Sequence, residues 1–171
     1  NKLIRFYDGA TGLKTGFTSS ALYCLSATAE RDGMELIAAV MHAPTSNERF
    51  DSAKALLSYG FANYALLPVY PSEAIPPIPV LLGREDTVQP VTARECVILV
   101  KKSEAGSVTT QMTLCGSVEA PVEPGQKLGE LQVFVDGQLR DTIDLTAARP
   151  VERLSLGGIF RDLLGKLFMA G

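Results

Sequence analysis

The sequence of 171 residues contains no tryptophan, a single histidine and three cysteines, with no Cys-x-x-Cys pair. A zinc site takes three or four Cys, His or carboxylate ligands at suitable spacing, and this sequence holds no such cluster. The formal net charge is -3, whereas a nucleic-acid-binding domain usually carries a basic surplus. We therefore expect a protein that uses no metal and no cofactor and binds no nucleic acid.

The few cysteines leave the redox environment open. Cys96 and Cys115 lie in consecutive strand-like segments, where a disulfide and two separate buried thiols are both compatible with the pattern, and the thiols are favoured. Cys24 follows Tyr23 in a predicted buried strand, so we expect a small core residue rather than a nucleophile. His42 has no sequence partner that predicts a general base, and we expect a structural or exposed role.

Proline is concentrated in one place. Residues 67–79 contain five of the ten prolines, and proline is excluded from helix interiors and central strands. This stretch therefore predicts a stiff linker, and it is the best domain boundary in the chain. With 46% hydrophobic and 20% charged residues, the segments on either side have enough apolar side chains for packed cores.

Before the linker, the pattern predicts antiparallel strands and one helix. A strand at 21–28, a tight turn at Asp32-Gly33 and a strand at 34–41 predict a hairpin. Residues 47–64 change to a helical period, and a threonine or serine just before them is suited to cap that helix.

After the linker, the pattern is β as far as residue 155. Short runs with a turn about every ten residues predict a small sandwich or barrel. Asp136-Gly137 between two alternating runs is the clearest hairpin turn. The predicted strands are 78–82, 87–91, 96–102, 108–114, 128–135, 139–144 and 151–156.

Residues 156–171 change period again. Apolar side chains recur every three and four residues, which predicts an amphipathic helix too short to span a bilayer. Two alternatives stay open for it: a helix that lies in the membrane interface, and a helix docked on the β domain.

The triplet Lys14-Thr15-Gly16 stands before a strand-like run and is preceded by a glycine that permits a turn. The Lys14 ammonium is suited to raise the positive potential beside a serine nucleophile, and the Thr15 hydroxyl to bond a substrate carboxylate. Gly16 leaves the strand without a side chain where another backbone can approach. Main-chain groups of Phe17 are then placed to pair with a bound peptide. Lys-Thr-Gly is the third signature motif of serine β-lactamases and penicillin-binding proteins.

In this setting the sequence closely resembles low-molecular-mass D-alanyl-D-alanine carboxypeptidases. The resemblance is densest over the first 64 residues, and the segments that follow occur in the same order as in that family. Thr11, where an acidic residue is common, and Leu22, in place of a frequent glycine, are the two departures. The likeness is carried by Tyr7, Gly9, Gly12–Thr18, Tyr23-Cys24-Leu25, Arg31-Asp32-Gly33, Leu36-Ile37 and the run Arg49–Phe61.

The resemblance implies an α+β fold. It predicts the C-terminal part of a β-lactamase/transpeptidase-like domain over 1–67, the linker over 68–79, a small all-β sandwich over 80–155, and over 156–171 an amphipathic helix that serves as a membrane anchor. It also implies a serine enzyme that removes the terminal D-Ala of peptidoglycan stem pentapeptides through an acyl-enzyme. Such an enzyme binds β-lactam antibiotics and acts at the outer face of the bacterial cytoplasmic membrane.

Matched residue by residue, the resemblance makes Lys14 a catalytic residue and makes Thr15, Gly16 and Phe17 substrate-binding residues. Arg49 falls where the family places an arginine that helps to engage the substrate carboxylate, a task for which a guanidinium is well suited. The alternative for Arg49 is a solvated helix residue.

Two further motifs of the family, Ser-x-x-Lys and Ser-x-Asn, do not occur in this sequence, and Ser52-Ala53-Lys54 has the wrong spacing. In the family both lie upstream of Lys-Thr-Gly. We therefore expect an excised or processed piece that begins at Asn1, needs the N-terminal catalytic portion as a partner and hydrolyses nothing alone. The alternative functions are a non-catalytic cell-wall binding or assembly module and, less favoured, a serine β-lactamase.

Overall fold

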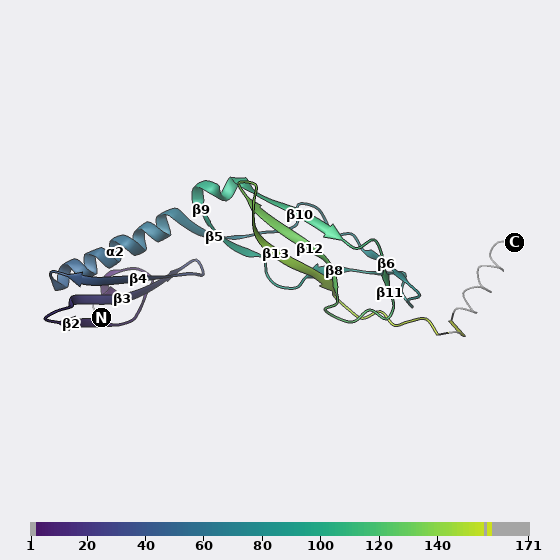
Figure 1. Cartoon of the computed structure of the whole chain (residues 1–171), viewed down its shortest axis with the longest axis horizontal. Coiled ribbons are helices and arrows are strands. Elements are labelled where there is room, and N and C mark those ends of the chain that lie inside the picture. The colour runs from purple at the N-terminus through teal and green to yellow at the C-terminus, as the bar shows by residue number, and fades with distance from the viewer. Residues whose placement is uncertain (1–2, 156, 159–171) are drawn as a thin grey trace. The chain divides into compact units, whose positions relative to one another are not determined.

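The computed structural model describes residues 3–155 and 157–158, and the chain divides into two compact units, each of which appears in Figure 1. Unit 1 consists of the residues up to Leu67 together with Val97–Gly106. Unit 2 consists of Pro68–Cys96 together with the residues from Ser107 on. The helix predicted over 156–171 lies almost entirely outside the described residues. None of the described helices is long and apolar enough to cross a membrane.

Unit 1 is built around one long central strand. The strand β3 pairs with β4 on one side and with the two short strands β1 and β2 on the other, all antiparallel. The bounds are α1 Leu3–Phe6, β1 Ala10–Gly12, β2 Thr15–Thr18, β3 Leu22–Arg31, β4 Met34–Ala43 and α2 Ser46–Asn63.

The predicted hairpin of unit 1 is present. Asp32 and Gly33 have φ angles of 51° and 75°, as the two central residues of a type I′ turn require. The predicted helix is also present as α2, and the Thr45 hydroxyl caps it by accepting a hydrogen bond from the Glu48 amide at 3.2 Å.

The helix α2 lies along one face of this sheet (Figure 1). Its apolar stripe packs against the side chains of β3 and β4 that point to the same face, and these residues form the core of unit 1. The core includes Leu25, Ala27 and Ala29 of β3, Met34 and Ala38 of β4, and Ala53, Leu57 and Phe61 of α2.

A second, small sheet of unit 1 differs from the sequence prediction. The strand β5, Tyr64–Pro68, pairs with β9, Val97–Lys101. The turn of 3₁₀ helix that follows β9 begins at Lys102, whose ammonium donates to the Phe61 carbonyl near the end of α2 at 2.8 Å. The sequence analysis placed this segment in the β domain, because a strand pattern does not reveal which distant strand it pairs with.

Up to residue 155, the regular structure of unit 2 consists of strands. A four-stranded sheet has the order β10-β12-β13-β8, and a three-stranded sheet has the order β11-β6-β7. Side chains from both sheets, among them Ile78, Leu128 and Ala147, share one core. The bounds are β6 Ile78–Leu81, β7 Thr87–Val88, β8 Pro90–Thr92, β10 Val108–Leu114, β11 Val118–Glu119, β12 Lys127–Val135 and β13 Gln138–Ala147.

Three details of unit 2 depart from the sequence prediction. The strand expected over 87–91 is two short strands, β7 and β8, which join different sheets. The strand expected over 151–156 is reduced to isolated bridges at Val151 and Arg153. Cys96 and Cys115 carry free thiols, as the sequence analysis favoured, but only Cys96 is buried; the exposed position of Cys115 is the third difference.

Candidate active-site strand

The Lys-Thr-Gly triplet begins the strand β2. The main-chain groups of Lys14 and Ser26 exchange two hydrogen bonds, at 3.1 and 2.9 Å, and Thr15–Thr18 continue the pairing with β3. Among the described residues, no strand pairs with the opposite edge of β2. The triplet therefore lies on an open sheet edge, which is where an extended peptide adds to a sheet.

A bend in the backbone separates this edge strand from β1. Gly12 has a φ of 148° and Leu13 a φ of 86°, and a positive φ costs a leucine conformational energy that glycine does not pay. Both β1 and β2 pair with β3, so the bend lets two short strands share one partner. The bend also sets Lys14 at the start of β2.

The pairing pattern decides which main-chain groups of β2 face the open edge. In an antiparallel pair, residues that exchange hydrogen bonds alternate with residues whose N–H and C=O point away. Because Lys14 exchanges bonds with Ser26, Thr15 and Phe17 direct their main-chain groups to the open edge. This agrees with the role that the sequence analysis expected for Phe17.

The side chains of the triplet alternate between the two faces of the sheet. Thr15 pairs with Leu25, whose side chain is buried in the core beneath α2, so Thr15 points to the α2 face. Lys14 and Gly16 point to the other face. Because the two faces meet at the edge of β2, a ligand that contacts both Lys14 and Thr15 has to lie along this edge.

The glycine at position 16 is not required by the packing of unit 1. A Cβ atom built there meets only the Cys24 Cβ, at 3.8 Å, which is an ordinary van der Waals contact. Its φ also lies outside the positive range that favours glycine. The missing side chain instead leaves the sheet surface beside Lys14 clear.

Arg49 comes from the first turn of α2 and reaches β2 from the α2 face. Its Nη1 donates to the carbonyl of Gly16 at 3.2 Å and to that of Cys24 at 3.5 Å, while Nη2 donates to the Ser46 hydroxyl at 3.2 Å. Its Nε atom is buried and has no hydrogen-bond partner in the described part of the chain. Arg49 therefore lies beside the strand that carries the Lys-Thr-Gly motif and donates a hydrogen bond to it.

Aromatic rings enclose this guanidinium. Its central carbon lies 5.3 Å from the Tyr23 ring centroid and 4.9 Å from that of Phe50, within the range of cation–π attraction. Tyr23 in turn contacts Phe17 with the ring centroids 4.6 Å apart. The sequence analysis did not assign Tyr23 or Ser46 to the site, because Tyr23 contacts Phe17 only through the pairing of β2 with β3, and Ser46 lies on a helix far along the chain.

The side chains of the other polar candidates, His42 and Cys24, take no part in the hydrogen bonds of Arg49. His42 is exposed and has a φ of 58°, at a bulge where two residues of β4 oppose one of β3. Cys24 is partly buried, and its thiol contacts the Ala21 carbonyl at 3.4 Å. In the described part of the chain, no cluster of His, Cys, Asp or Glu is suited to hold a metal ion.

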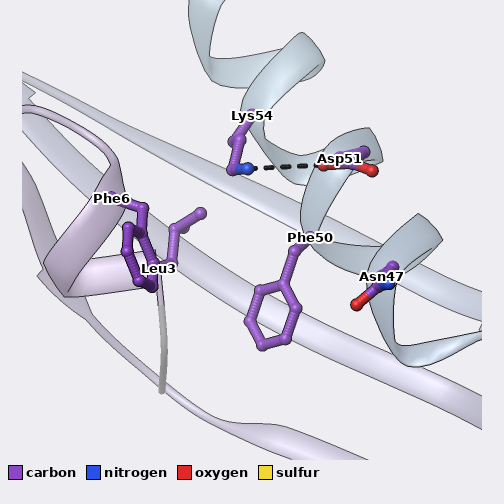
Figure 2. Close-up of a pocket in the computed structure, with 6 residues that line it drawn as sticks. All are labelled: Leu3, Phe6, Asn47, Phe50, Asp51 and Lys54. Carbon is purple, nitrogen blue, oxygen red and sulfur yellow. Dashed lines mark hydrogen bonds and ion pairs between the residues drawn. The ribbon is translucent and has the colours of Figure 1, made fainter.

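A pocket of about 320 Å³ lies where α1 faces the N-terminal half of α2 (Figure 2). Its apolar lining comes from Leu3, Phe6 and Phe50. Its polar lining comes from Asn47 and the Asp51–Lys54 ion pair. The sequence analysis missed this pocket because α1 has only four residues, which is too short for a periodic pattern.

Two family models match the chain. One, described as "Penicillin-binding protein 5, C-terminal domain", matches residues 68–153, and the other, described as "D-alanyl-D-alanine carboxypeptidase", matches residues 1–45. The chain belongs to the low-molecular-mass penicillin-binding proteins. The resemblance expected from the Lys-Thr-Gly region is thereby confirmed, and the second match contains the whole of β1 and β2.

Individual relatives agree with this family. The D-alanyl-D-alanine carboxypeptidase DacF of Bacillus subtilis is 34% identical over 141 residues, which cover 81% of this chain and 36% of the relative. The carboxypeptidase DacA of Haemophilus influenzae is 30% identical over 156 residues, with coverages of 90% and 40%. The chain thus spans well under half of the length of these relatives.

A solved structure supports the fold. The crystal structure of penicillin binding protein 5 from Haemophilus influenzae is similar with a TM-score of 0.70 and 28% identity. The similarity covers 89% of this chain and 45% of that chain. The fold of this chain is therefore similar to that solved structure over most of its length.

Proposed function

We propose that this chain supplies the Lys-Thr-Gly strand of a serine-type D-alanyl-D-alanine carboxypeptidase. Such an enzyme removes the terminal D-Ala of peptidoglycan stem pentapeptides and is acylated by penicillin. The observation that carries the proposal is the placement of Lys14-Thr15-Gly16 on a strand whose outer edge is open. Membership in the penicillin-binding family supports it.

In this proposal, the substrate peptide lies along β2 as an added strand. The main-chain groups of Thr15 and Phe17 hydrogen-bond to it, the Thr15 hydroxyl donates to its terminal carboxylate, and Gly16 leaves room for it. The Lys14 ammonium supplies positive charge next to the reacting groups, and preorganised charge of this kind stabilises the developing oxyanion and carboxylate.

The serine nucleophile and the lysine that activates it are expected outside this chain. The serine oxygen attacks the carbonyl carbon of the penultimate D-Ala, and the bond to the terminal D-Ala breaks as the leaving amine gains a proton. Water then hydrolyses the ester and returns the serine. In both steps β2 binds and orients the peptide, and effective orientation is a large part of such a rate enhancement.

Lys14→Ala in the protein that carries this chain tests the proposal. Intact mass spectrometry after incubation with penicillin is expected to show a penicilloyl adduct in the parent protein and about a hundredfold slower acylation in the variant. Lys54→Ala removes an exposed, ion-paired lysine from α2 and is the matched control, with unchanged acylation. If no polypeptide associated with this chain forms an adduct, the enzyme proposal fails and the cell-wall binding module takes its place.

An extracytoplasmic location follows if the substrate is peptidoglycan. We include in the proposal that residues 156–171 attach the protein to the outer face of the cytoplasmic membrane, because their apolar side chains recur at helical spacing. Co-sedimentation with membranes, measured before and after removal of these residues, tests this part. Unchanged sedimentation would exclude the anchor without affecting the enzymatic part.

A further inference from the structure

Two neighbouring leucines of unit 2 leave their side chains in solvent. Along β6 the side chains alternate, so that Ile78 and Val80 point into the core of unit 2 and Leu81 points away from it. Leu81 is 54% exposed, and Leu82, which follows the strand, is 45% exposed. A single exposed leucine is ordinary in a folded protein, and this pair is distinguished by its backbone and by its place in the fold.

The backbone at Leu82 is unusual for a leucine. Its φ is 56°, in the left-handed region that residues other than glycine seldom occupy and in which asparagine is several-fold enriched. A leucine held there costs conformational energy, and because its side chain is half exposed, burial within unit 2 offsets little of that cost. Such strain points to a function for the exposed side chain.

The two leucines lie where the described chain leaves unit 2. The Leu154 amide donates to the Leu82 carbonyl at 2.8 Å, and the Gly158 amide then turns back to the Ser155 carbonyl at 2.8 Å. Consecutive Cα atoms are about 3.8 Å apart, so residue 156 lies within about 8 Å of Leu154. If residues 156–171 lie in the membrane interface, as proposed above, the end of β6 lies beside that interface.

Charged groups at this end of unit 2 are paired with one another. An unpaired carboxylate is repelled by an anionic lipid surface, whereas a carboxylate joined to a guanidinium presents little net charge to it. These pairs therefore remove an obstacle to contact between the leucines and lipid headgroups. The three pairs are Arg84–Glu152 at 2.7 Å, Arg149–Glu85 at 2.8 Å and Arg153–Glu119 at 3.0 Å.

We infer that Leu81 and Leu82 form a second lipid contact of the protein, which enters the membrane interface beside residues 156–171. The inference rests on the membrane attachment that the proposed function includes. A short amphipathic segment binds lipid reversibly, and a second apolar contact joined to it adds to the affinity because it binds the same surface intramolecularly. Two contacts also fix the orientation of unit 2 on the membrane, which a single point of attachment leaves free.

Substitutions of opposite effect test this contact. The protein that carries this chain is sedimented with vesicles of equal parts phosphatidylcholine and phosphatidylglycerol, and a lipid titration gives the dissociation constant. Leu82→Asn is expected to weaken binding about three- to tenfold, because the apolar surface is lost. Its thermal stability is expected to stay equal or rise, since asparagine adopts left-handed angles more readily than leucine. Leu81→Phe is expected to strengthen binding.

The control variant is Leu139→Asn, which is expected to leave vesicle binding unchanged. Leu139 is 53% exposed and lies at the hairpin end of β13, the end away from Leu154. All three substitutions change side chains and leave in place the Leu82 carbonyl that the Leu154 amide binds. An effect on affinity therefore reports contact of the side chain with lipid rather than a change in where the chain leaves unit 2.

Removal of residues 156–171 separates the contact from the anchor. Weaker binding in Leu82→Asn, with Leu139→Asn unchanged, supports the contact. Release of the protein by the deletion, with full affinity in Leu82→Asn, would overturn the contact and leave the anchor in place. A higher affinity in Leu82→Asn would mean that the pair holds residues 159–171 against unit 2, and would overturn it too. If the parent protein binds no vesicles, anchor and contact both fail, while penicillin acylation of the same sample still decides the enzymatic proposal.

Discussion

The two units of the chain use their apolar side chains differently. Among the residues that the structure describes, unit 2 buries most of its large aliphatic side chains, and it holds ten of the twelve largest that are fully buried. In unit 1, α2 covers one face of the sheet, while Ile37 and Met41 of β4 remain 70% and 79% exposed and Phe17 of β2 is 58% exposed. Unit 2 thus has a core shared by two sheets. Unit 1 is a sheet that α2 covers on one face, with an open edge at β2. Apolar groups exposed in this way are typical of interaction surfaces.

The largest stability effect is expected from the core of unit 2. Leu131 lies at the centre of β12 with 0% of its surface exposed. Leu131→Ala is expected to lower the free energy of unfolding by about 2–5 kcal/mol, because the lost contacts leave a cavity. Urea titration measures this change. At temperatures where the variant is folded, penicillin acylation of the parent protein is expected to keep its rate.

Leu57→Ala is the corresponding core substitution in unit 1. Leu57 of α2 is 1% exposed and belongs to the core of unit 1, where α2 packs on β3, the strand that pairs with β2. A loss of stability is expected here too, together with slower acylation, since α2 also carries Arg49. If both leucine variants slowed acylation equally in the folded state, the assignment of the site to unit 1 alone would be wrong.

The next largest loss of stability is expected where a glycine is replaced at a tightly packed position. A substitution that overpacks such a position lowers the free energy of unfolding by about 1–3 kcal/mol. A Cβ at Gly129 of β12 would collide with the Thr113 carbonyl oxygen and approach the Leu114 Cδ2 at 2.7 Å, whereas a Cβ at Gly16 makes an ordinary van der Waals contact with the Cys24 Cβ at 3.8 Å. Gly129→Ala is therefore expected to destabilise unit 2 without slowing acylation.

Gly16→Ala is expected to show the reverse: unchanged stability and slower acylation, because the new methyl group occupies the surface beside Lys14. Unfolding curves and acylation rates, each measured for Gly129→Ala and Gly16→Ala, separate the effect on stability from the effect on acylation. A stable and fully active Gly16→Ala variant would remove the argument that this glycine leaves room for the substrate.

Local patterns predicted much of this architecture from the sequence. The helix α2 follows from its period and its threonine cap, and two hairpins follow from Asp-Gly pairs that take left-handed angles in the structure, as Asp136 and Gly137 do at 50° and 74°. These features depend on neighbours in sequence, so single segments specify them.

Non-local pairing could not be predicted in the same way. The alternation of Val97–Lys101 is the same whether it pairs with β5 or with a strand of unit 2. The candidate site shows the same difference between features that neighbours in sequence specify and features that distant segments specify. Lys14, Thr15, Gly16 and Phe17 were predicted from a contiguous motif, and their roles stay predictions, but the hydrogen bonds of Arg49 depend on a helix that begins some thirty residues later.

The smallest effect is expected from an ion pair on unit 2. Arg94 and Asp141 are joined by two hydrogen bonds of 2.7 Å. The hydrogen bond from Arg94 holds the pKa of Asp141 below its usual value, and the amide of Thr142 acts in the same direction. A carboxyl group with a lowered pKa in the folded state stabilises the fold at neutral pH, and this contribution disappears as the pH falls through that lowered pKa.

Asp141→Asn is therefore expected to lower the stability of the protein slightly at pH 7 and not at all at the acid end, where Asp141 is protonated in both states. The pair is partly exposed, so salt screening keeps the effect well below that of either core substitution. Urea titrations of the parent and the variant, from pH 7 down to a pH below the lowered pKa of Asp141, measure the difference. A difference that stayed constant over this range would mean that the aspartate acts through the Thr142 turn rather than through its charge. Repeating the series in the Arg94→Met background, where the difference is expected to shrink, separates the two contributions.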